Sequence, residues 1–553
     1  MAEIKYIGGY PEYMRKIIEK VEKTREKRLG YTPAAMSMKE RDEVLKIHPD
    51  FAPGGKREIL VGPNKGERGS NEVVDLLEAY PLVDAGDIDL SRVDYETKIL
   101  IIGGGLAGTS AALWANDKGI KPQDILLTNK LRHGDANSIM AEGGTQAADR
   151  EVDSPDLHFL DTIGGGHFAN KPDVVRALVE DAPLVIKWLC ELGAIFDREA
   201  NGDLVEKLAG GISRRRMHSC RDYTGLEEFR VLRDEFRSRE ISYLEHYPVI
   251  ELLTDAKRVT GALLWNLETG EYKIVKAQAT IIATGGYGRL HIRGFPTTNH
   301  YGATFDGVVL AYRVGARLRD IDAVQYHPTG AAYPLQIVGH LLTEKLRGSG
   351  AQPVNCDGEA FVYALEPRDV EAASFIRECY VRDKGIVTPT GLRGVWLDTP
   401  LIDLKNGRGF IEKEFPGMMR MYTRYEIDMS KDPVLVFPTL HYQNGGIETD
   451  PWGKTNIEGL WVAGEVSGGV HGKNRLMGNS TLDCLVFGRR SGIDTAEYVK
   501  SGNKKNSAKL TFDHLKIYVQ SLKEAGVKPT RRAPILLPDY RGKAALARMI
   551  DVF

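Results

Sequence analysis

The stretch KILIIGGGLAG, residues 98–108, constrains the fold more than any other part of the chain. An apolar run ends at a glycine cluster and a segment of small, helix-forming residues follows, which predicts a strand, a tight turn and a helix. Gly103, Gly105 and Gly108 have the spacing GxGxxG. In this motif the first glycine permits the turn, the second lets a pyrophosphate approach the backbone, and the third lets the helix pack closely on the strand. A second apolar run at 125–128 completes the pattern of a βαβ unit and predicts dinucleotide binding.

Length and composition exclude several classes of protein. With 553 residues the chain is too long for a single core, so several domains are expected. The net charge of −2 gives no reason to expect nucleic acid or an anionic membrane as a partner. Apolar runs stay short of the roughly 20 residues that span a bilayer, and residues 1–6 lack an apolar signal core, so we expect a cytoplasmic protein. The five cysteines are scattered without a CxxC pair, and from this spacing we predict no disulfide framework, no iron–sulfur cluster and no metal site within the chain.

Helices are expected in three places outside the glycine-rich motifs. Apolar residues at helical spacing between 14 and 21 predict an amphipathic helix in an N-terminal arm, which would lie on its own domain or on a partner subunit. Glycine, proline and charged residues dominate 50–69 and predict an extended loop. A helix is predicted over 171–197, and another over 511–525, where Gly526 follows as a cap.

Further motifs follow along the chain in a fixed order. They are AEGG at 141–144, ATGGYGR at 283–289, QYHPTG at 325–330, TEKLRG at 343–348, PRD at 367–369, HYQNGG at 441–446, AGE at 463–465 and HGKNRLMGNS at 471–480. A strand-forming run at 459–465 returns late, as though the nucleotide domain were interrupted and then completed. Over about residues 95–495 this series resembles the flavoprotein subunit of the succinate dehydrogenase/fumarate reductase family.

The resemblance implies an α/β fold in which a Rossmann-like FAD-binding domain is split by an inserted α+β capping domain. An N-terminal extension and a short helical C-terminal tail would flank them. The expected segments are 1–90 for the extension, 91–328 and 439–498 for the two parts of the FAD-binding domain, 329–438 for the cap and 499–553 for the tail. The active site would lie in the cleft between the two domains.

The resemblance also implies FAD as the cofactor. Thr128 and Lys130 stand where many dinucleotide folds place an acidic residue for the ribose, which disfavours a plain NAD dehydrogenase. The expected contacts with FAD are Gly103, Gly105 and Gly108 at the pyrophosphate, Thr128 and Lys130 at the adenosine end, Gly143 and Gly144 beside the isoalloxazine, and Asp306, Glu465, Ser480 and Leu482 elsewhere.

For the substrate, the resemblance implies a C4 dicarboxylate. Its carboxylates would be held by His327, Thr343, His441 and Arg475. Arg368 matches the family's proton donor, and Glu344 and Arg347 match its relay to solvent. An arginine is a very weak acid, but hydride transfer from flavin N5 to fumarate builds carbanion character on the neighbouring carbon, and such a basic centre suits a very weak acid.

Two positions depart from the family pattern. Asn137 stands where most members of membrane complexes have a histidine attached covalently to the flavin, so we expect noncovalent FAD. A noncovalent flavin has a lower potential, which within the family favours fumarate reduction. Ala209 replaces a phenylalanine that packs on the substrate, which predicts room for a substituted dicarboxylate.

The expected function is therefore that of a flavoprotein subunit that interconverts fumarate and succinate, or a close relative of that pair, in the reducing direction. Electrons would be exchanged with an iron–sulfur subunit, because this chain lacks cluster ligands, and any membrane attachment would be through partners. One alternative is an L-aspartate oxidase-like flavoenzyme. Another is a non-catalytic flavin electron carrier in a larger complex, against which the set Arg368, Glu344 and Arg347 argues, because a carrier needs no proton relay.

Overall fold

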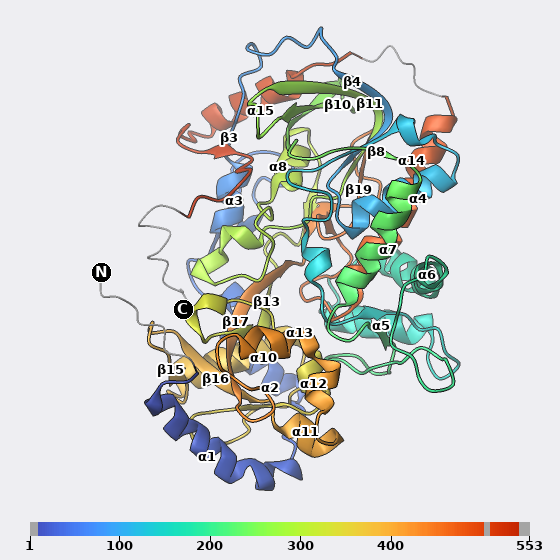
Figure 1. Ribbon diagram of the computed structural model, residues 1–553. Coiled ribbons are helices and arrows are strands. Elements are labelled where there is room, and N and C mark those ends of the chain that lie inside the picture. Colours follow the sequence, from blue (N-terminus) through green and yellow to red (C-terminus); the bar gives the residue numbers. More distant parts are fainter. Residues whose placement is uncertain (1–8, 503–508, 541–553) are drawn as a thin grey trace.

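The computed structural model describes residues 9–502 and 509–540. Residues 1–8 of the predicted N-terminal extension, and 503–508 and 541–553 of the predicted C-terminal tail, lie outside the described residues. A seven-stranded main sheet forms one end of an elongated molecule (Figure 1). In spatial order it contains β8 (Ser242–Leu244), β5 (Ile125–Thr128), β4 (Tyr95–Ile102), β11 (Tyr272–Ile282), β10 (Arg258–Trp265) and β9 (Val249–Asp255), with β19 (Leu460–Val462) paired to β11. The strands β8, β5, β4, β11 and β19 are parallel, as expected for a Rossmann-like sheet.

Six helices accompany the main sheet in the same part of the molecule. They are α4 (Leu106–Asp117), α5 (Pro155–Gly165), α6 (Pro172–Glu191), α7 (Thr224–Ser238), α8 (Asp306–Arg313) and α14 (Asn479–Lys500). The predicted helix over 171–197 is confirmed by α6, which ends just before Gly193. Helix α14 crosses α4 closely, since a Cβ at Gly488 would lie 2.6 Å from the carbonyl oxygen of Ala107 and one at Gly492 would lie 2.4 Å from that of Ala111. Small residues thus let α14 pack closely on α4, although the two helices lie far apart in the sequence.

A second sheet forms the other end of the molecule. It contains β13 (Val324–Ala331), β17 (Val434–Gln443), β16 (Arg393–Asp398) and β14 (Gln352–Val354), with β15 (Ile386–Val387) paired to β16. Its helices are α9 (Lys345–Gly348), α10 (Arg368–Ile376), α11 (Leu401–Asn406), α12 (Phe410–Glu414) and α13 (Pro416–Thr423). Strands β13 and β17 lie between the two ends of the molecule (Figure 1), so residues on them face both parts.

The N-terminal arm lies on its own chain. Helix α1 (Glu12–Leu29) confirms the predicted amphipathic helix, and it lies beside the second sheet at the lower end of Figure 1. Arg25 and Arg28 both pair with Asp398, at 2.9 and 2.7 Å, and the Asp398 side chain is fully buried. Because an unpaired buried carboxylate is strongly unfavourable, these two arginines fix the arm to β16. Helices α2 (Met38–Leu45) and α3 (Asn71–Leu77) complete the arm.

The prediction of an extended loop over 50–69 is wrong in part. Strands β1 (Lys56–Glu58) and β2 (Arg68–Ser70) form an antiparallel hairpin there, and Ile59 and Val61 are buried. The glycines that suggested a loop form the turn instead, since Gly62 and Gly66 have positive φ.

The C-terminal tail runs back toward the main sheet. Helix α15 (Asp513–Glu524) confirms the predicted helix and buries Leu515, Tyr518 and Leu522. Strand β21 (Arg532–Ala533) then pairs with β3 (Tyr80–Pro81) of the arm. The remaining short pairs are β6 (Thr145–Gln146) with β7 (Met217–His218), and β18 (Gly446–Glu448) with β12 (Leu318–Arg319) and β20 (Ser467–Gly468).

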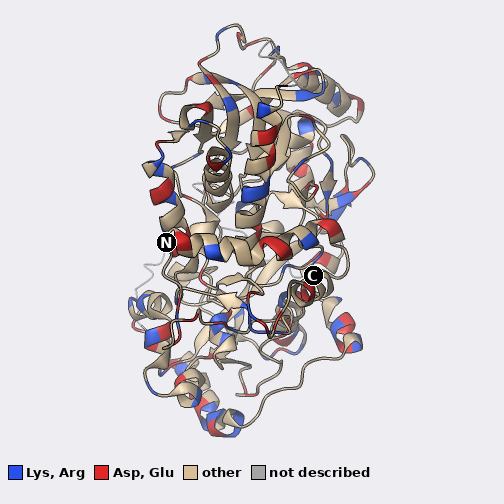
Figure 2. Ribbon diagram, turned by 90° about the vertical axis from the view of Figure 1, so that its right-hand side faces the viewer, with Lys and Arg blue, Asp and Glu red and all other residues tan. Residues whose placement is uncertain are grey.

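Charged residues of both signs are interspersed along the outer elements (Figure 2), in keeping with the near-zero net charge. Within the described ranges, none of the helices is both long enough and apolar enough to cross a bilayer.

Candidate active site

Two adjoining cavities lie where the main sheet meets the second sheet. The smaller, of about 120 Å³, lies at the carboxyl ends of β4 and β5 and is called here the nucleotide cavity. The larger, of about 630 Å³, extends to the second sheet and is called the central cavity. Asn137, Ser138, Glu465 and Cys484 line both, so the two spaces meet at these residues. The crevice outside the carboxyl ends of parallel strands is the usual ligand site of such sheets.

The glycine motif forms the wall of the nucleotide cavity. Gly103 has a φ of +108°, and a Cβ there would lie 2.3 Å from the carbonyl oxygen of Ala283. A Cβ at Gly108 would lie 1.9 Å from the carbonyl oxygen of Gly103. Gly105 caps α4, and the backbone N–H of Leu106 donates to Ser138 Oγ at 3.1 Å. The amino end of α4 therefore faces a glycine-walled space, which suits phosphate groups.

Unpaired polar atoms in the nucleotide cavity fit a dinucleotide. Asn129 Nδ2 and Thr284 Oγ1 are buried there, and neither has a hydrogen-bond partner in the described part of the chain. Lys130 Nζ forms an ion pair with Asp306 and donates to the carbonyl oxygen of Leu536 at 2.6 Å. The C-terminal tail thus reaches the expected adenosine end. These groups would hold the adenosine and pyrophosphate of FAD.

The expected flavin wall faces the central cavity. Gly143, Gly144 and Ser480 line it, and a Cβ at Gly144 would lie 2.5 Å from the carbonyl oxygen of His218. Asn137 is fixed by a hydrogen bond from its Nδ2 to Asn299 Oδ1 at 3.1 Å. A wall with two glycines and no side chain at either position fits the close approach of a planar ring.

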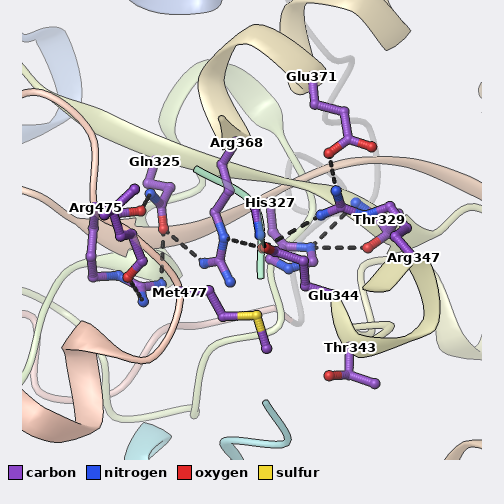
Figure 3. Close-up of polar contacts among 12 residues, drawn as sticks. Gln325, His327, Thr329, Thr343, Glu344, Arg347, Arg368, Glu371, Arg475 and Met477 are labelled. Carbon is purple, nitrogen blue, oxygen red and sulfur yellow. Dashed lines mark hydrogen bonds and ion pairs between the residues drawn. The ribbon is translucent and has the colours of Figure 1, made fainter. Parts of the chain in front are cut away.

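A chain of charged side chains leads away from the central cavity (Figure 3). Arg368, the first residue of α10, donates from Nε to Glu344 Oε2 at 2.8 Å. Arg347 Nη2 lies 3.4 Å from the same oxygen, and Arg347 Nη1 pairs with Glu371. Glu344 Oε1 accepts the backbone N–H of Gly210 at 2.7 Å, so both carboxylate oxygens are held. The residues of the predicted relay are therefore in contact with one another.

Gln325 joins Arg368 and Arg475, and sequence reasoning missed this residue. Its Oε1 accepts from Arg368 Nη1 at 3.0 Å and from Arg475 Nη2 at 2.8 Å (Figure 3). Its Nε2 donates to the carbonyl oxygen of Arg475 at 2.7 Å. The Arg475 guanidinium also lies 4.2 Å above the ring of Tyr442. Gln325 occurs in the motif QYHPTG, but nothing in the spacing reveals which side chains it contacts.

Two histidines face each other from neighbouring strands. The rings of His327 on β13 and His441 on β17 are 5.1 Å apart between centroids, in an edge-to-face arrangement. His327 Nδ1 accepts the backbone N–H of Thr329 at 3.2 Å, so a neutral ring carries its proton on Nε2. Thr343 lines the same cavity.

Burial sets the charge state of these groups. It lowers the pKa of His327 and of His441 well below the ordinary value, and the nearby Arg368 lowers both further, so the imidazoles are neutral at pH 7. Burial also lowers the pKa of Arg368, against the attraction of Glu344, and that of Arg475 to about 9. Burial alone would raise the pKa of Glu344, but the charges of Arg368 and Arg347 lower it. Arg368 and Arg475 thus present guanidinium groups beside the neutral imidazoles of His327 and His441, which suits a dianion.

Most of the predicted site residues lie on the two cavities. The central cavity is lined by Asn137, Gly143, Gly144, His327, Thr343, Glu344, Arg368, His441, Glu465, Arg475 and Ser480, and the nucleotide cavity by Gly103, Gly105, Thr128, Lys130, Asn137, Asp306 and Glu465. Gly108, Arg347 and Leu482 line neither cavity. Gly108 packs against the turn, Arg347 lies behind Glu344, and Leu482 is a fully buried core residue of α14.

The expected extra room beside Ala209 is absent from the central cavity. Ala209 is 3% exposed and belongs to an apolar cluster with Ile212, Met217, Leu476 and Met477. Of these five residues only Met477 lines the cavity. The small side chain of Ala209 is therefore packed within this cluster and does not face the central cavity.

Comparisons with known proteins agree with this geometry. A family model described as an FAD binding domain matches residues 98–481. The chain is 36% identical over 445 residues to one of the subunits of the fumarate reductase (CoM/CoB) of Methanothermobacter marburgensis, with 79% of each chain covered. It is 35% identical over 412 residues to L-aspartate oxidase of Streptomyces coelicolor, covering 72% of this chain and 68% of that protein. A mutant of the E. coli quinol fumarate reductase FrdA superposes with a TM-score of 0.69 at 30% identity, covering 78% of this chain and 74% of that one.

Proposed function

The chain belongs to the FAD-dependent oxidoreductase family of the fumarate reductase and succinate dehydrogenase flavoproteins, which act on CH–CH bonds, and we propose that it reduces fumarate or a close C4 dicarboxylate. This membership confirms the resemblance inferred from the motifs, and FAD is the cofactor. L-Aspartate oxidases are also close relatives, so the substrate has to be argued from the site.

The observation that carries the proposal is that Arg368 and Arg475 both line the central cavity and both donate to Gln325 Oε1. Arg475, His327 and His441 would bind and orient the two carboxylates of the substrate. FAD, when bound, supplies the hydride. Arg368 Nη2 bonds to no group in the described residues, and we assign it the proton donated to the substrate carbon. Glu344 holds the guanidinium in place and passes a proton back to it from the direction of Arg347.

Acidic groups in the central cavity argue against an amino acid substrate. An ammonium group is best stabilised by an ionised carboxylate. Glu344 is already bonded to Arg368, and burial raises the pKa of Glu142, of Asp222 and, to about 7, of Glu465. Each raised pKa disfavours the ionised form that an ammonium group needs, which supports fumarate over L-aspartate as the substrate.

The two substrates can be separated directly. Purified holoprotein should oxidise a reduced viologen dye when fumarate is added. Under air with L-aspartate, it should form no hydrogen peroxide above the rate without substrate. Peroxide formation from L-aspartate together with inert fumarate would replace the proposal with an oxidase function.

We further propose that FAD is held noncovalently. Asn137 has an amide where a covalent link would need a nucleophilic ring nitrogen, and its Nδ2 is bonded to Asn299. Acid precipitation of the holoprotein should therefore release the yellow colour into the supernatant. A flavin that stays with the washed pellet contradicts this proposal and weakens the inferred preference for reduction.

An iron–sulfur protein is the proposed electron donor, and the cytoplasm is the proposed location. Support comes from the scattered cysteines, all five of which are free thiols, and from the relative that is named as part of a multi-subunit reductase. Isolation from the native source should yield a second polypeptide that contains iron. If the flavoprotein purifies alone and reduces fumarate with a soluble electron donor, the proposal of an iron–sulfur partner is contradicted.

A further inference from the structure

We propose that Asp149, Glu206 and His218 form a binding site for one divalent transition-metal ion. One ligand atom from each of the three residues lies within 4.8 Å of the other two. The residues come from three separate segments, namely the chain just after β6, the loop before the glycine pair at 210–211, and β7. The cysteine spacing led to the prediction that the chain has no metal site. These three ligands include no cysteine and do not form a recognisable sequence motif. The proposal does not depend on the substrate assigned above.

Two side chains of this cluster, His218 and Glu206, keep buried polar atoms that have no hydrogen-bond partner in the described residues. His218 is fully buried, and neither of its ring nitrogens makes a hydrogen bond in the described structure. Its Nε2 lies 3.2 Å from Asp149 Oδ2, which is close enough for an ion pair without the geometry of a hydrogen bond. Glu206 Oε1 is likewise buried and unpaired. Buried imidazole and carboxylate groups normally have partners, so these atoms point to a missing ligand.

Neighbouring charges leave room for a cation. Arg150 forms an ion pair with Glu206, and its Nε lies 3.3 Å from Oε2, while Oε1 has no hydrogen-bond partner in the described residues. Without a cation, Asp149 faces the His218 imidazole, and Glu206 has Arg150 as its ion-pair partner. A divalent ion would neutralise both acids and satisfy the ring nitrogen at once.

The donor set selects the class of ion. One imidazole nitrogen and two carboxylates suit Zn²⁺ or another first-row divalent metal, whereas Ca²⁺ and Mg²⁺ prefer oxygen ligands alone. Of the common ions Zn²⁺ binds such sites more tightly than Mn²⁺ or Fe²⁺. The Asp149 side chain is 24% exposed, which gives the ion an entry path and leaves a position for water.

The position of the cluster indicates a structural role beside the flavin wall. Thr145 pairs with His218 across the β6–β7 ladder, next to Gly144. A bound ion would tie three segments together directly behind this wall. Since an ion that binds only the folded protein stabilises it, the thermal midpoint should rise with the zinc concentration.

Zinc titration of the EDTA-treated holoprotein tests the site. We expect one equivalent of Zn²⁺ by calorimetry, a higher thermal midpoint with Zn²⁺, and no comparable effect of Mg²⁺. Glu206→Gln and Asp149→Asn keep the side-chain size and should weaken zinc binding at least tenfold. Glu268→Gln is the matched control, because it removes a carboxylate that lies 2.8 Å from another histidine, His246, and it should leave the zinc affinity unchanged.

Two results would overturn the proposal. One is the absence of stoichiometric zinc binding by the wild-type holoprotein. The other is a zinc equivalent that persists at full affinity in both Glu206→Gln and Asp149→Asn, which would place the ion at other histidines such as the pair in the central cavity. Both variants leave His218 in the core, so a failure of a His218 variant to fold does not affect the test.

Discussion

Replacing Arg368 with glutamine should lower the kcat for fumarate by roughly 10²–10⁴-fold, the usual contribution of a positioned general acid. Glutamine keeps an N–H group that can bond to Glu344, but it has no proton to give to a carbanion-like carbon. The pKa of Arg368 is lowered by burial, and the partial positive charge at the amino end of α10 acts in the same direction. Dye oxidation under saturating fumarate measures the effect, and the flavin absorbance per protein should stay at the wild-type value.

Arg420 provides the control for this substitution. It lies on α13 at the exposed side of the same cavity, so Arg420→Gln removes one positive charge without touching the relay. We expect its kcat to stay within about twofold of wild type, because surface charges away from the reacting atoms contribute little. Unchanged turnover in Arg368→Gln would instead favour a flavin electron carrier whose chemistry takes place elsewhere.

Gly108→Ala should yield protein with little or no flavin. The added Cβ would lie 1.9 Å from the carbonyl oxygen of Gly103. Neither atom can move away by rotation of a side chain, because the Cβ position and the carbonyl oxygen are both set by the backbone. The turn must move, and overpacking of this kind costs about 1–3 kcal/mol or more. If the strain falls on the holo form, FAD affinity drops by up to about a hundredfold. The flavin-to-protein ratio and a fluorescence titration of the apoprotein measure this loss.

Gly164→Ala is the matched control for the glycine motif. Gly164 also lies in a helix, α5, and a Cβ there would meet nothing within 4 Å. Alanine is the better helix former by up to about 1 kcal/mol, so this variant should keep its flavin and be slightly more stable. Full flavin content in Gly108→Ala would show that the close approach of α4 to the turn is not required.

Local chemistry made part of the fold predictable. The turn at Gly103 and the contact at Gly108 follow from glycine spacing, because the requirement for a missing Cβ is set within a few residues. Local signals likewise predict three helices: apolar stripes that recur every three or four residues predict α1 and α15, and Pro172 and Gly193 mark the ends of α6. The resemblance then supplied the site residues that periodicity alone does not single out.

Features that depend on distant contacts were missed. Gln325 contacts Arg475 across 150 positions of sequence, and only the placement of β13 against the loop at 471–478 brings them together. The segments of Asp149 and His218 meet because β6 pairs with β7, and the isolated bridge between Lys207 and Met217 brings Glu206 beside them. Both pairings are too short to be read from a pattern. Ala209 packs in an apolar cluster and does not line the central cavity, and packing of this kind depends on side chains from several segments at once.

The late return of the chain to the main sheet has a consequence for biosynthesis. Strand β19 pairs with β11, α14 packs on α4, and Thr481 contacts Thr145 Oγ1 at 2.6 Å across 336 positions of sequence. A ribosome must therefore make the chain as far as α14 before the flavin has a finished place to bind. A nonsense mutation between β17 and α14 would leave a colourless product for the cell's proteases.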